Sequence, residues 1–498
     1  MRNLFFCSLL LLATISRAQT VPVWQLGKDD MLRVQQLTGK IDAAQSLTAR
    51  PFFNRNLPDT LAILPVSFSL KFNSHHPYGW NDAGMIMAKG LQTAVSAGVY
   101  AKVGPLSIQL MPEFYFAANP AYATTAGYGS NAGKSFQKGY PGQSSIRLHL
   151  GPVSIGASTE NLWWGPGQFS SLMMSNNAPS FQHLTFNTTR PLKTPIGSFE
   201  WQLIVGKLNE DTSAAFENAY LKPFHPRNDW RYLNGIVLTY QPKFLPNFFF
   251  GVTRSEHLYQ SDLDRKSGFI KKYLPVFVGS SPSANADASS IPSDGAFSFF
   301  GRWILPQHRA EFYLEYGYND FKQNMRDFSV NANHSSAYIA GFKKIIALKN
   351  NQLLDLSGEI TQMAQTTGYV VRNAGNWYEH AGVNQGFTHQ NQILGAGSGF
   401  GNNVQTLQVK KINGMQQIGI KLQRIQQDPK GGLVYGSVPT LAMRDLQWND
   451  VSIGFLGQKK FNRFLLNGEL QLVHSKNYGW EKGNKMNLYS YIRCSYFF

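Results

Sequence analysis

Cysteine is scarce in this sequence. Only Cys7 and Cys494 occur among 498 residues. Cys7 lies early in an N-terminal apolar run and not at its end, where a lipid-modified residue would stand, so we expect it to be lost with that run. A mature chain with one thiol has no internal disulfide and no cysteine-based metal site. We therefore predict no metal and no cofactor.

Long hydrophobic runs are missing as well. The longest extends from Leu4 to Ile15, about a dozen residues, whereas a membrane-spanning helix needs ~20. Arg2 precedes this run, and Ser16-Arg17-Ala18 follows it before Gln19, which is the layout of a secretory signal. We expect residues 1–18 to be removed on export and the mature chain to lack a transmembrane helix.

Acidic residues are few. The chain has 29 Asp and Glu against 46 Lys and Arg, a formal charge of +17, yet charged residues make up 15% of the sequence. The basic residues are scattered and form no stripe in a recognisable nucleic-acid-binding module. We therefore exclude nucleic acid as a partner and favour acidic lipid or acidic glycan, which suit an exported protein.

Aromatic residues (13%) and glycine (45 residues) are plentiful, while the mean hydropathy is slightly negative at −0.25. Apolar and polar residues alternate in segments such as VSIGASTE (153–160) and FLLNGELQL (464–472). Alternation with a period of two indicates strands with one apolar face. In a transmembrane β-barrel every second side chain faces lipid, which produces this composition. A secreted soluble β-protein is the competing interpretation.

The connections between these predicted strands are alternately short and long. Among the short ones we count Gly104-Pro105, Gly151-Pro152, 242–247, 306–308 and 458–460, and among the long ones 117–143, 209–230, 258–295 and 364–403. Bacterial outer-membrane barrels have short periplasmic turns, long outer loops and an even number of strands. We predict an all-β fold, a transmembrane antiparallel β-barrel of about 18 strands over residues 59–498, in the outer membrane. We place the strands at 62–72, 91–103, 106–116, 144–151, 153–160, 183–190, 198–208, 231–242, 248–257, 296–305, 310–318, 335–346, 353–363, 404–412, 415–425, 447–458, 462–474 and 486–498.

The two ends of the chain add detail. Residues 28–48 hold good helix formers with spaced apolar residues, and Pro51 follows, so we predict a periplasmic segment (19–58) with one or two short helices. In the final segment, 486–498, apolar and polar residues alternate. The even-numbered residues are apolar or aromatic, apart from Ser490, and the segment ends on Phe498. A final amphipathic strand ending in Phe resembles the signal that delivers barrels of Gram-negative bacteria to their insertion machinery, so we expect that machinery to be a partner.

Charged residues occupy the polar face of several predicted strands. Alternation places both signs inside the barrel, which fits a lumen cross-linked by ion pairs at least as well as a selective pore. The residues expected to face the lumen are Glu160, Glu200, Arg231, Arg302, Glu311, Glu315, Asp355, Glu359, Arg463, Glu469 and Arg493.

The motif ENLWWGPGQ (160–168) follows the fifth predicted strand, at the outer rim if the N-terminal segment is periplasmic. Together with SSLMMSNNAPSFQHL (170–184), RPL (190–192) and GSFEWQLIVGKL (197–208), it resembles the core motif of the Wzi family of capsule-assembly outer-membrane proteins. Residues 78–92, 104–122 and 233–257 resemble the family too. The resemblance covers most of the mature chain, and the WWGPG block is its most specific part.

The resemblance implies an 18-stranded barrel with a small helical periplasmic part. It also implies a non-enzymatic, lectin-like role in binding or organising exported capsular polysaccharide. An indole covers the apolar face of a sugar ring with few rotors to order, and Arg binds carboxylates of acidic sugars in a bidentate manner. Candidate glycan-binding residues are Glu160, Asn161, Trp163, Trp164, Trp230 and Arg231, with Tyr122, Tyr128, Tyr140, Trp377 and Tyr378 also expected near the outer rim.

Each of these residues also has a structural interpretation. Aromatic residues form interfacial girdles, and Gly165 and Gly167 allow a tight turn around Pro166, so WWGPG is equally suited to a loop that plugs the barrel. For Trp163 and Trp164 the sequence leaves both roles open: contact with polysaccharide, or support of the loop that closes the barrel at the cell-surface mouth.

Two other functions deserve comparison. An 18-stranded barrel is wide enough for an aqueous lumen, so a channel for small solutes is the alternative to polysaccharide binding.

A hydrolase is the other function to compare, and it needs a nucleophile and a base that converge. Ser255-Glu256-His257 is the nearest arrangement, and the sequence has neither G-x-S-x-G nor H-E-x-x-H. We therefore predict no catalytic residues.

Overall fold

The chain is described here by a computed structural model. The predicted signal, residues 1–18, lies outside the described residues. The structure describes residues 20–21, 28–53, 60–122, 133–216, 227–278, 291–319, 329, 334–364, 376–380, 382–428 and 446–498.

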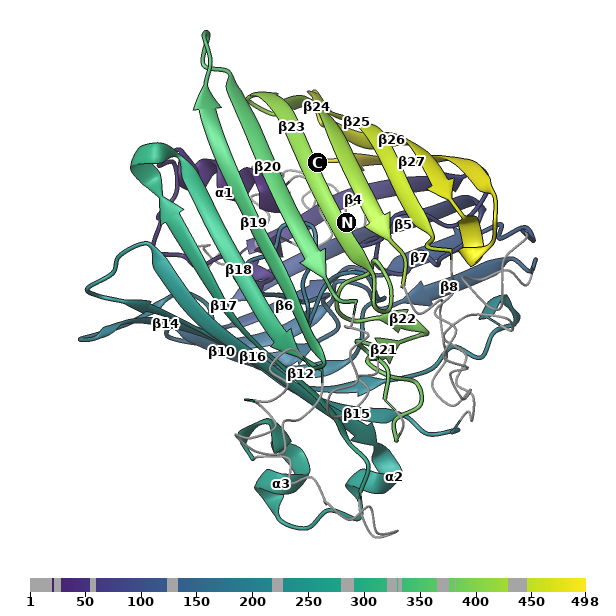
Figure 1. Ribbon diagram of the computed structural model, residues 1–498. Helices are drawn as coiled ribbons and strands as arrows, with labels where there is room; N and C mark the ends of the chain where they lie inside the picture. Colours follow the sequence, from purple (N-terminus) through teal and green to yellow (C-terminus); the bar gives the residue numbers. More distant parts are fainter. Residues whose placement is uncertain are drawn as a thin grey trace, which may run out of the picture.

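The described strands form a closed antiparallel barrel in which the last wall strand pairs with the first (Figure 1). Three of its eighteen strands consist of two segments each, so the predicted fold and strand number are confirmed. The wall is formed by β4 (Thr60–Asn73), β5 (Gly90–Val103), β6 (Leu106–Leu110) with β7 (Glu113–Ala117), β8 (Phe136–Tyr140) with β9 (Ser145–Leu150), β10 (Val153–Ser158), β12 (His183–Thr188) with β13 (Leu192–Thr194), β14 (Gly197–Leu208), β15 (Arg231–Pro242), β16 (Phe248–Tyr259), β17 (Asp294–Leu305), β18 (Ala310–Tyr318), β19 (Ser336–Ala347), β20 (Leu353–Gln362), β23 (Asn403–Asn413), β24 (Gln416–Gln426), β25 (Asn449–Phe461), β26 (Phe464–Lys476) and β27 (Asn484–Tyr496).

Proline accounts for the interrupted strands. Pro112 separates β6 from β7, Pro141 follows β8, and Pro191 precedes β13. Proline has no backbone N–H to donate to a sheet, so pairing breaks or bulges where it occurs. The first two interruptions lie side by side in neighbouring strands, where Met111 and Gly142 form an isolated bridge.

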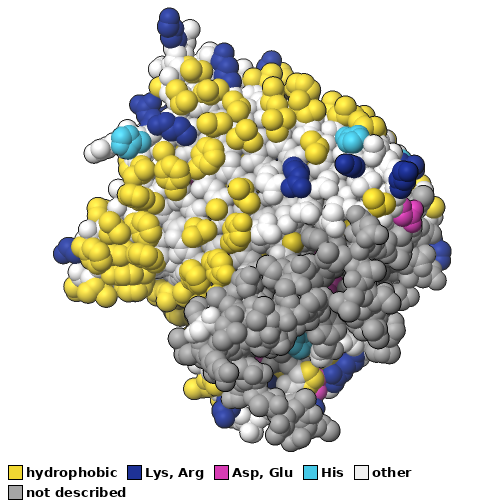
Figure 2. Space-filling view, viewed as in Figure 1, with side chains coloured by type: hydrophobic (Ala, Val, Ile, Leu, Met, Phe, Trp, Pro, Cys, Tyr) yellow, Lys and Arg dark blue, Asp and Glu magenta, His cyan; other side chains and the backbone are white. Residues whose placement is uncertain are grey.

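Side chains alternate between the lumen and a lipid-facing belt. In β27, Met486, Leu488 and Ile492 are exposed on the outside, while Asn487 and Tyr491 are buried inside, as the sequence predicted. Figure 2 shows apolar side chains spread over the outer strand surface. Apolar residues facing outward around a closed barrel are the hallmark of an outer-membrane barrel.

Short and long connections alternate as expected, with one local error. We predicted the turn before β26 at 458–460 and placed Arg463 in the lumen. Instead, β25 continues to Phe461 and the turn is formed by Asn462 and Arg463, whose side chain is exposed. Asn462 has φ 52°, a left-handed conformation that Asn tolerates better than most residues, so the turn forms there.

The N-terminal segment contains one helix, α1 (Lys28–Leu37). Val34 and Leu37 of α1 pack on inward-facing Phe249, Ile304 and Ile412, which lie next to short turns. The helix therefore occupies the lumen at the end of the barrel where the short turns are, as Figure 1 also shows.

The remaining elements are short. None of the helices in the described part of the chain is long and apolar enough to cross a membrane. The short elements are β1 (Thr20–Val21) paired with β3 (Phe52–Phe53), β2 (Ala49–Arg50) paired with β11 (Trp163–Trp164), β21 (Thr388–His389) paired with β22 (Gln392–Ile393), α2 (Gln260–Leu263), α3 (Phe269–Tyr273), and the 3-10 turns η1 (Ala214–Phe216), η2 (Pro275–Phe277), η3 (Pro306–His308) and η4 (Tyr478–Trp480).

Candidate functional site

The segment after β10, residues 159–182, turns back into the barrel. Nearly all of its residues are buried, and its Pro166 carbonyl accepts a hydrogen bond from Arg33 of α1, at the short-turn end of the lumen. The expectation that Trp163 and Trp164 lie at the cell-surface mouth is therefore wrong. The segment carries apolar residues such as Leu162 and Met173, whose burial favours an inward path. We call residues 159–182 the first plug loop.

Trp164 lies against the inner wall with no exposed surface. Its Nε1 donates a hydrogen bond to Gln202 Oε1 at 2.7 Å, which satisfies the polar atom of a buried indole. The ring also packs on β15 at Gly235, where an added Cβ would lie 2.8 Å from the ring atom Cη2. Gln202 and Gly235 thus form the contact surface for Trp164, and neither residue stands out in the sequence.

Trp163 points the other way, toward a cavity in the lumen. Its backbone pairs with Arg50 in the short β2–β11 sheet, and the Arg50 guanidinium lies 4.8 Å from the centre of the indole ring, within cation–π range. The side chain is 4% exposed. Among the described residues, its Nε1 has no hydrogen-bond partner.

The Gly165-Pro166-Gly167 turn fits between α1 and the wall. Gly165 has φ 98°, and a Cβ there would lie 2.8 Å from Glu315 Oε2. At Gly167 a Cβ would meet a backbone oxygen at 1.9 Å. Arg50 Nη2 donates to the Gly167 carbonyl at 3.1 Å, so the N-terminal segment and the first plug loop are joined at this turn.

Glu160 and Asn161 connect the plug loop to the wall. Glu160 is paired with Arg147 at 2.6 Å, and both side chains are buried. Asn161 accepts a hydrogen bond from Gln143 at 2.7 Å and donates to the Ala178 carbonyl at 2.8 Å. The luminal position predicted for Glu160 is correct. The hydrogen-bonding capacity of both side chains is used inside the protein.

Arg231 and Trp230 lie at the outer end of β15, with different environments. Arg231 is 1% exposed and donates to the carbonyl oxygens of Gly386 and Thr388, so it holds another loop. Trp230 is half-buried, and Lys207 Nζ lies 5.0 Å from the centre of its ring. Of the six candidate residues, Trp230 therefore presents the most surface to solvent.

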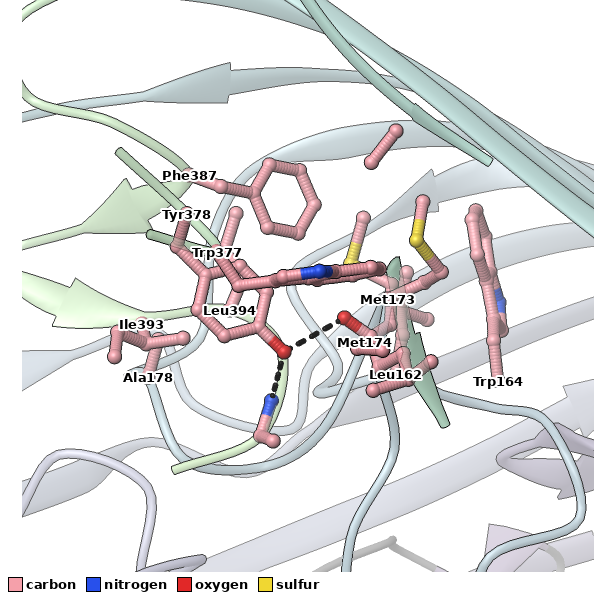
Figure 3. Close-up of a cluster of buried hydrophobic side chains, with 14 of the residues drawn as sticks. Leu162, Trp164, Met173, Met174, Ala178, Trp377, Tyr378, Phe387, Ile393 and Leu394 are labelled. Atoms are coloured by element: carbon pink, nitrogen blue, oxygen red, sulfur yellow. Dashed lines mark hydrogen bonds between the residues drawn. The ribbon is translucent and has the colours of Figure 1, made fainter. Parts of the chain in front are cut away.

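The loop held by Arg231 is the second plug loop, and the structure describes its residues 376–380 and 382–402. Tyr378 joins the two loops, because its hydroxyl donates to the Leu172 carbonyl at 2.9 Å and accepts from the Ala396 N–H at 2.8 Å (Figure 3). Trp377 donates to the Ser335 carbonyl at 3.1 Å. Both loops contribute to one hydrophobic cluster inside the barrel that includes Trp164, Met173, Trp377, Phe387 and Leu394.

Ion pairs attach α1 to the wall. Asp30 is paired with Lys343 at 2.7 Å and also with Lys410. Burial by itself raises the pKa of Asp30, but the two ammonium groups outweigh this effect and lower the pKa below its ordinary value. Arg33 pairs with Glu311 at 2.8 Å. The ion-paired lumen predicted from strand alternation is present, with α1 supplying further charges.

A cavity of about 240 Å³ remains between α1, the first plug loop, the connection after β4 and strands β23–β27. Its wall combines aromatic, amide and charged side chains, among them Trp80, Trp163, Gln408, Lys421 and Glu469. Gln417 and Gln458 extend the lining toward the short turns, so the cavity lies on the α1 side of the plug.

The remaining candidates have structural partners. Tyr122, Tyr140, Trp377 and Tyr378 are buried, while Tyr128 lies outside the described residues. Ser255 and His257 face the lumen, whereas Glu256 faces outward and pairs with Lys266 at 3.2 Å, so these three side chains do not converge. Within the described ranges, no group of three or more His, Cys, Asp or Glu is arranged to hold a metal ion.

Comparison with known proteins identifies the family. Residues 73–488 match the family described as capsule assembly protein Wzi. The chain belongs to the Wzi family. The comparison with curated proteins gives no match. The family assignment agrees with the resemblance seen in the WWGPG block and its flanks.

One solved structure shares the barrel fold of this chain, and others are more distantly similar. Wzi of Escherichia coli, an outer membrane protein involved in group 1 capsule assembly and described as a carbohydrate-binding β-barrel, is 11% identical with a TM-score of 0.65. The alignment covers 96% of this chain and 99% of that one. OprD of Pseudomonas aeruginosa is 6% identical with a TM-score of 0.43, covering 88% and 94%. The outer membrane channel DcaP of Acinetobacter baumannii is 8% identical with a TM-score of 0.36, covering 90% and 99%.

Proposed function

We propose that this Wzi family member binds exported capsular polysaccharide at the cell surface and retains it there without catalysis. The observation that carries the proposal is the shared hydrophobic cluster of the two plug loops, which occupies the lumen against the inner faces of β14, β15, β17, β18 and β19. A barrel filled in this way is better suited to present an outer surface to a polymer than to pass it through.

The half-buried Trp230 with Lys207 supports a contact site at the outer rim. The ring offers an apolar face for a sugar, and the ammonium group attracts acidic sugar carboxylates. Trp163, Trp164, Glu160, Asn161 and Arg231 serve in this proposal as the scaffold that keeps the plug loops and the rim in place, because their contacts lie inside the barrel.

A capsule-retention assay tests the proposal. Cells lacking the protein should shed polysaccharide into the medium, and Trp230→Ala should weaken retention while leaving insertion and heat-modifiable mobility unchanged. Trp201→Ala, a wall tryptophan on the outer face of β14, is the matched control. Normal capsule retention in cells lacking the protein, with no second copy present, would contradict the proposal, as would failure of the purified barrel to bind an acidic capsular glycan.

The cavity in the lumen favours a channel as the second candidate function. It provides amide and charged groups on the α1 side of the plug, as a solute pathway would. Planar-bilayer recording separates the two functions. Steady large openings of the wild-type protein at neutral pH would support a channel, and electrical silence would support a plugged barrel that acts through its outer surface.

A further inference from the structure

Residues 260–278, the part of the connection after β16 that the structure describes in contact with the wall, fold over the outside of the barrel instead of the mouth. The outward-facing Tyr232 donates to the Tyr273 carbonyl at 2.6 Å. Outward-facing Asn234 accepts from the Val276 N–H at 3.2 Å, and Arg254 donates to the Val278 carbonyl at 2.9 Å. Residues 260–278, with α2, α3 and η2, are therefore fixed to the outer face of β15 and β16, below the wall in Figure 1.

This segment begins where the lipid-facing belt ends. Along the outer face of β16, Phe250 and Val252 are exposed at 47% and 37%. The next outward residue, Arg254, already binds the segment, and a two-residue step along a strand covers about 7 Å. The attached segment, which includes Phe277, is thus bound by the first outward residue beyond the exposed apolar pair of β16.

The segment exposes apolar side chains that nothing in the described chain covers. Phe269 is 70% exposed, Ile270 55% and Phe277 57%. Lys271 and Lys272 lie beside them in the last turn of α3, and Lys272 also pairs with the exposed Asp264 at 3.3 Å. Aromatic and aliphatic residues combined with Lys are the composition of segments that lie in a membrane interface, with apolar side chains in the acyl boundary and ammonium groups at anionic headgroups.

We propose that residues 269–277 form an interfacial anchor that inserts into the outer leaflet beside β15 and β16 and binds its phosphate-bearing lipid headgroups through Lys271 and Lys272. The occupant is the lipid surface, because the exposed side chains continue the lipid-facing belt on the same strands and because their charge is opposite to that of anionic headgroups. The anchor does not depend on polysaccharide binding, and it would set the depth and tilt of the barrel.

Site-directed spin labelling in proteoliposomes tests this. In a Cys494→Ser background, nitroxide labels are placed at Ile270→Cys and Phe277→Cys. Asn228→Cys, exposed in the neighbouring connection, is the aqueous control, and Leu470→Cys, on the lipid-facing side of β26, is the lipid control. We expect labels at 270 and 277 to collide with oxygen in preference to a water-soluble nickel chelate, like the label at 470 and opposite to that at 228.

Two results would overturn the anchor. Labels at 270 and 277 that behave like the label at 228 would place the segment in water. Labels inaccessible to both reagents would show that protein covers it, either a second copy or another part of this chain. Because each label reports on its own position, neither result depends on whether the protein binds glycan.

The role of the lysines is tested with lipid charge. Vesicles of phosphatidylcholine are compared with vesicles that also contain phosphatidylglycerol, for the parent and for Lys271→Gln/Lys272→Gln. The anionic lipid should raise the ratio of oxygen to nickel accessibility at position 270 in the parent and leave it unchanged in the double variant. An equal rise in both would overturn headgroup binding by these lysines.

Discussion

The Trp164 indole lies so close to Gly235 that a Cβ at residue 235 would come within 2.8 Å of its Cη2 atom. This contact joins the first plug loop to strand β15. Since the same indole also donates to Gln202, a single side chain couples the WWGPG motif to two neighbouring wall strands. The position of the plug therefore depends on a glycine in a strand that is far from the motif in sequence.

Gly235→Ala should push Trp164 out of its contact with the wall and loosen the plug. Overpacking of this kind costs roughly 1–3 kcal/mol. We expect a lower midpoint of heat-induced mobility change and transient openings in planar bilayers. Gly457→Ala is the control, because a Cβ there meets nothing within 4 Å. Wild-type behaviour of Gly235→Ala would show that Trp164 is not tightly held.

The two tryptophans should differ in their importance for stability. Trp164→Ala removes a fully buried ring and leaves Gln202 without its donor, which should cost about 3–5 kcal/mol of unfolding free energy. Trp163→Ala should cost less, because part of its ring borders the cavity. Urea unfolding of the refolded barrel in detergent measures both. Equal losses, or a larger loss for Trp163→Ala, would contradict this packing.

Asp30→Asn should release α1 from the lumen. The substitution leaves Lys343 with Asp355 but removes a charge shared by two lysines, and breaking a buried ion pair typically costs about 3–5 kcal/mol. We expect faster cleavage of the N-terminal segment by an added protease. Asp42→Asn makes the same change in net charge at an exposed position and should leave cleavage unchanged. Resistance of Asp30→Asn equal to wild type would contradict the role of the pair.

Acid should open the second plug loop through His389. Its Nδ1 accepts a hydrogen bond from the Asn209 N–H at 3.1 Å. Burial, together with Arg231 and Lys138, lowers the pKa of His389 to about 3. In the open loop the pKa returns to its usual 6.5. The closed form is thus fully favoured above pH 6.5 and loses stability as the pH falls from 6.5 toward 3.

Bilayer conductance measured across this pH range tests the effect. We expect openings to increase below pH 6.5 in wild type and to increase less in His389→Gln, which keeps a hydrogen-bond acceptor but does not titrate. His308→Gln, at an exposed turn, is the control. Burial and the neighbouring His75 lower the pKa of His76 to about 3. His76 should therefore leave some pH dependence in His389→Gln. Identical pH profiles for wild type and His389→Gln would rule out this histidine as the switch.

The strands could be predicted because the membrane imposes a simple rule on sequence. Each wall segment must pair its backbone with its neighbours and alternate lipid-facing with luminal side chains. Local sequence therefore determines the two-residue period and the number of strands. It also determines the side of the wall to which Glu160 or Asn487 points. The misplaced Arg463 shows the limit of that rule: alternation continues through the end of β25 and does not mark the residue at which the chain turns.

The sequence by itself determined the barrel and its family, because strand alternation and the WWGPG block with its flanks are contiguous patterns. Only the tertiary structure decided where that block goes. The path of residues 159–182 into the lumen depends on Arg33, Gln202, Gly235 and Tyr378, which lie far apart in sequence and are ordinary residues in their own segments. Long-range packing of this kind leaves no local pattern, so the role of Trp164 as part of a plug emerged only from its contacts.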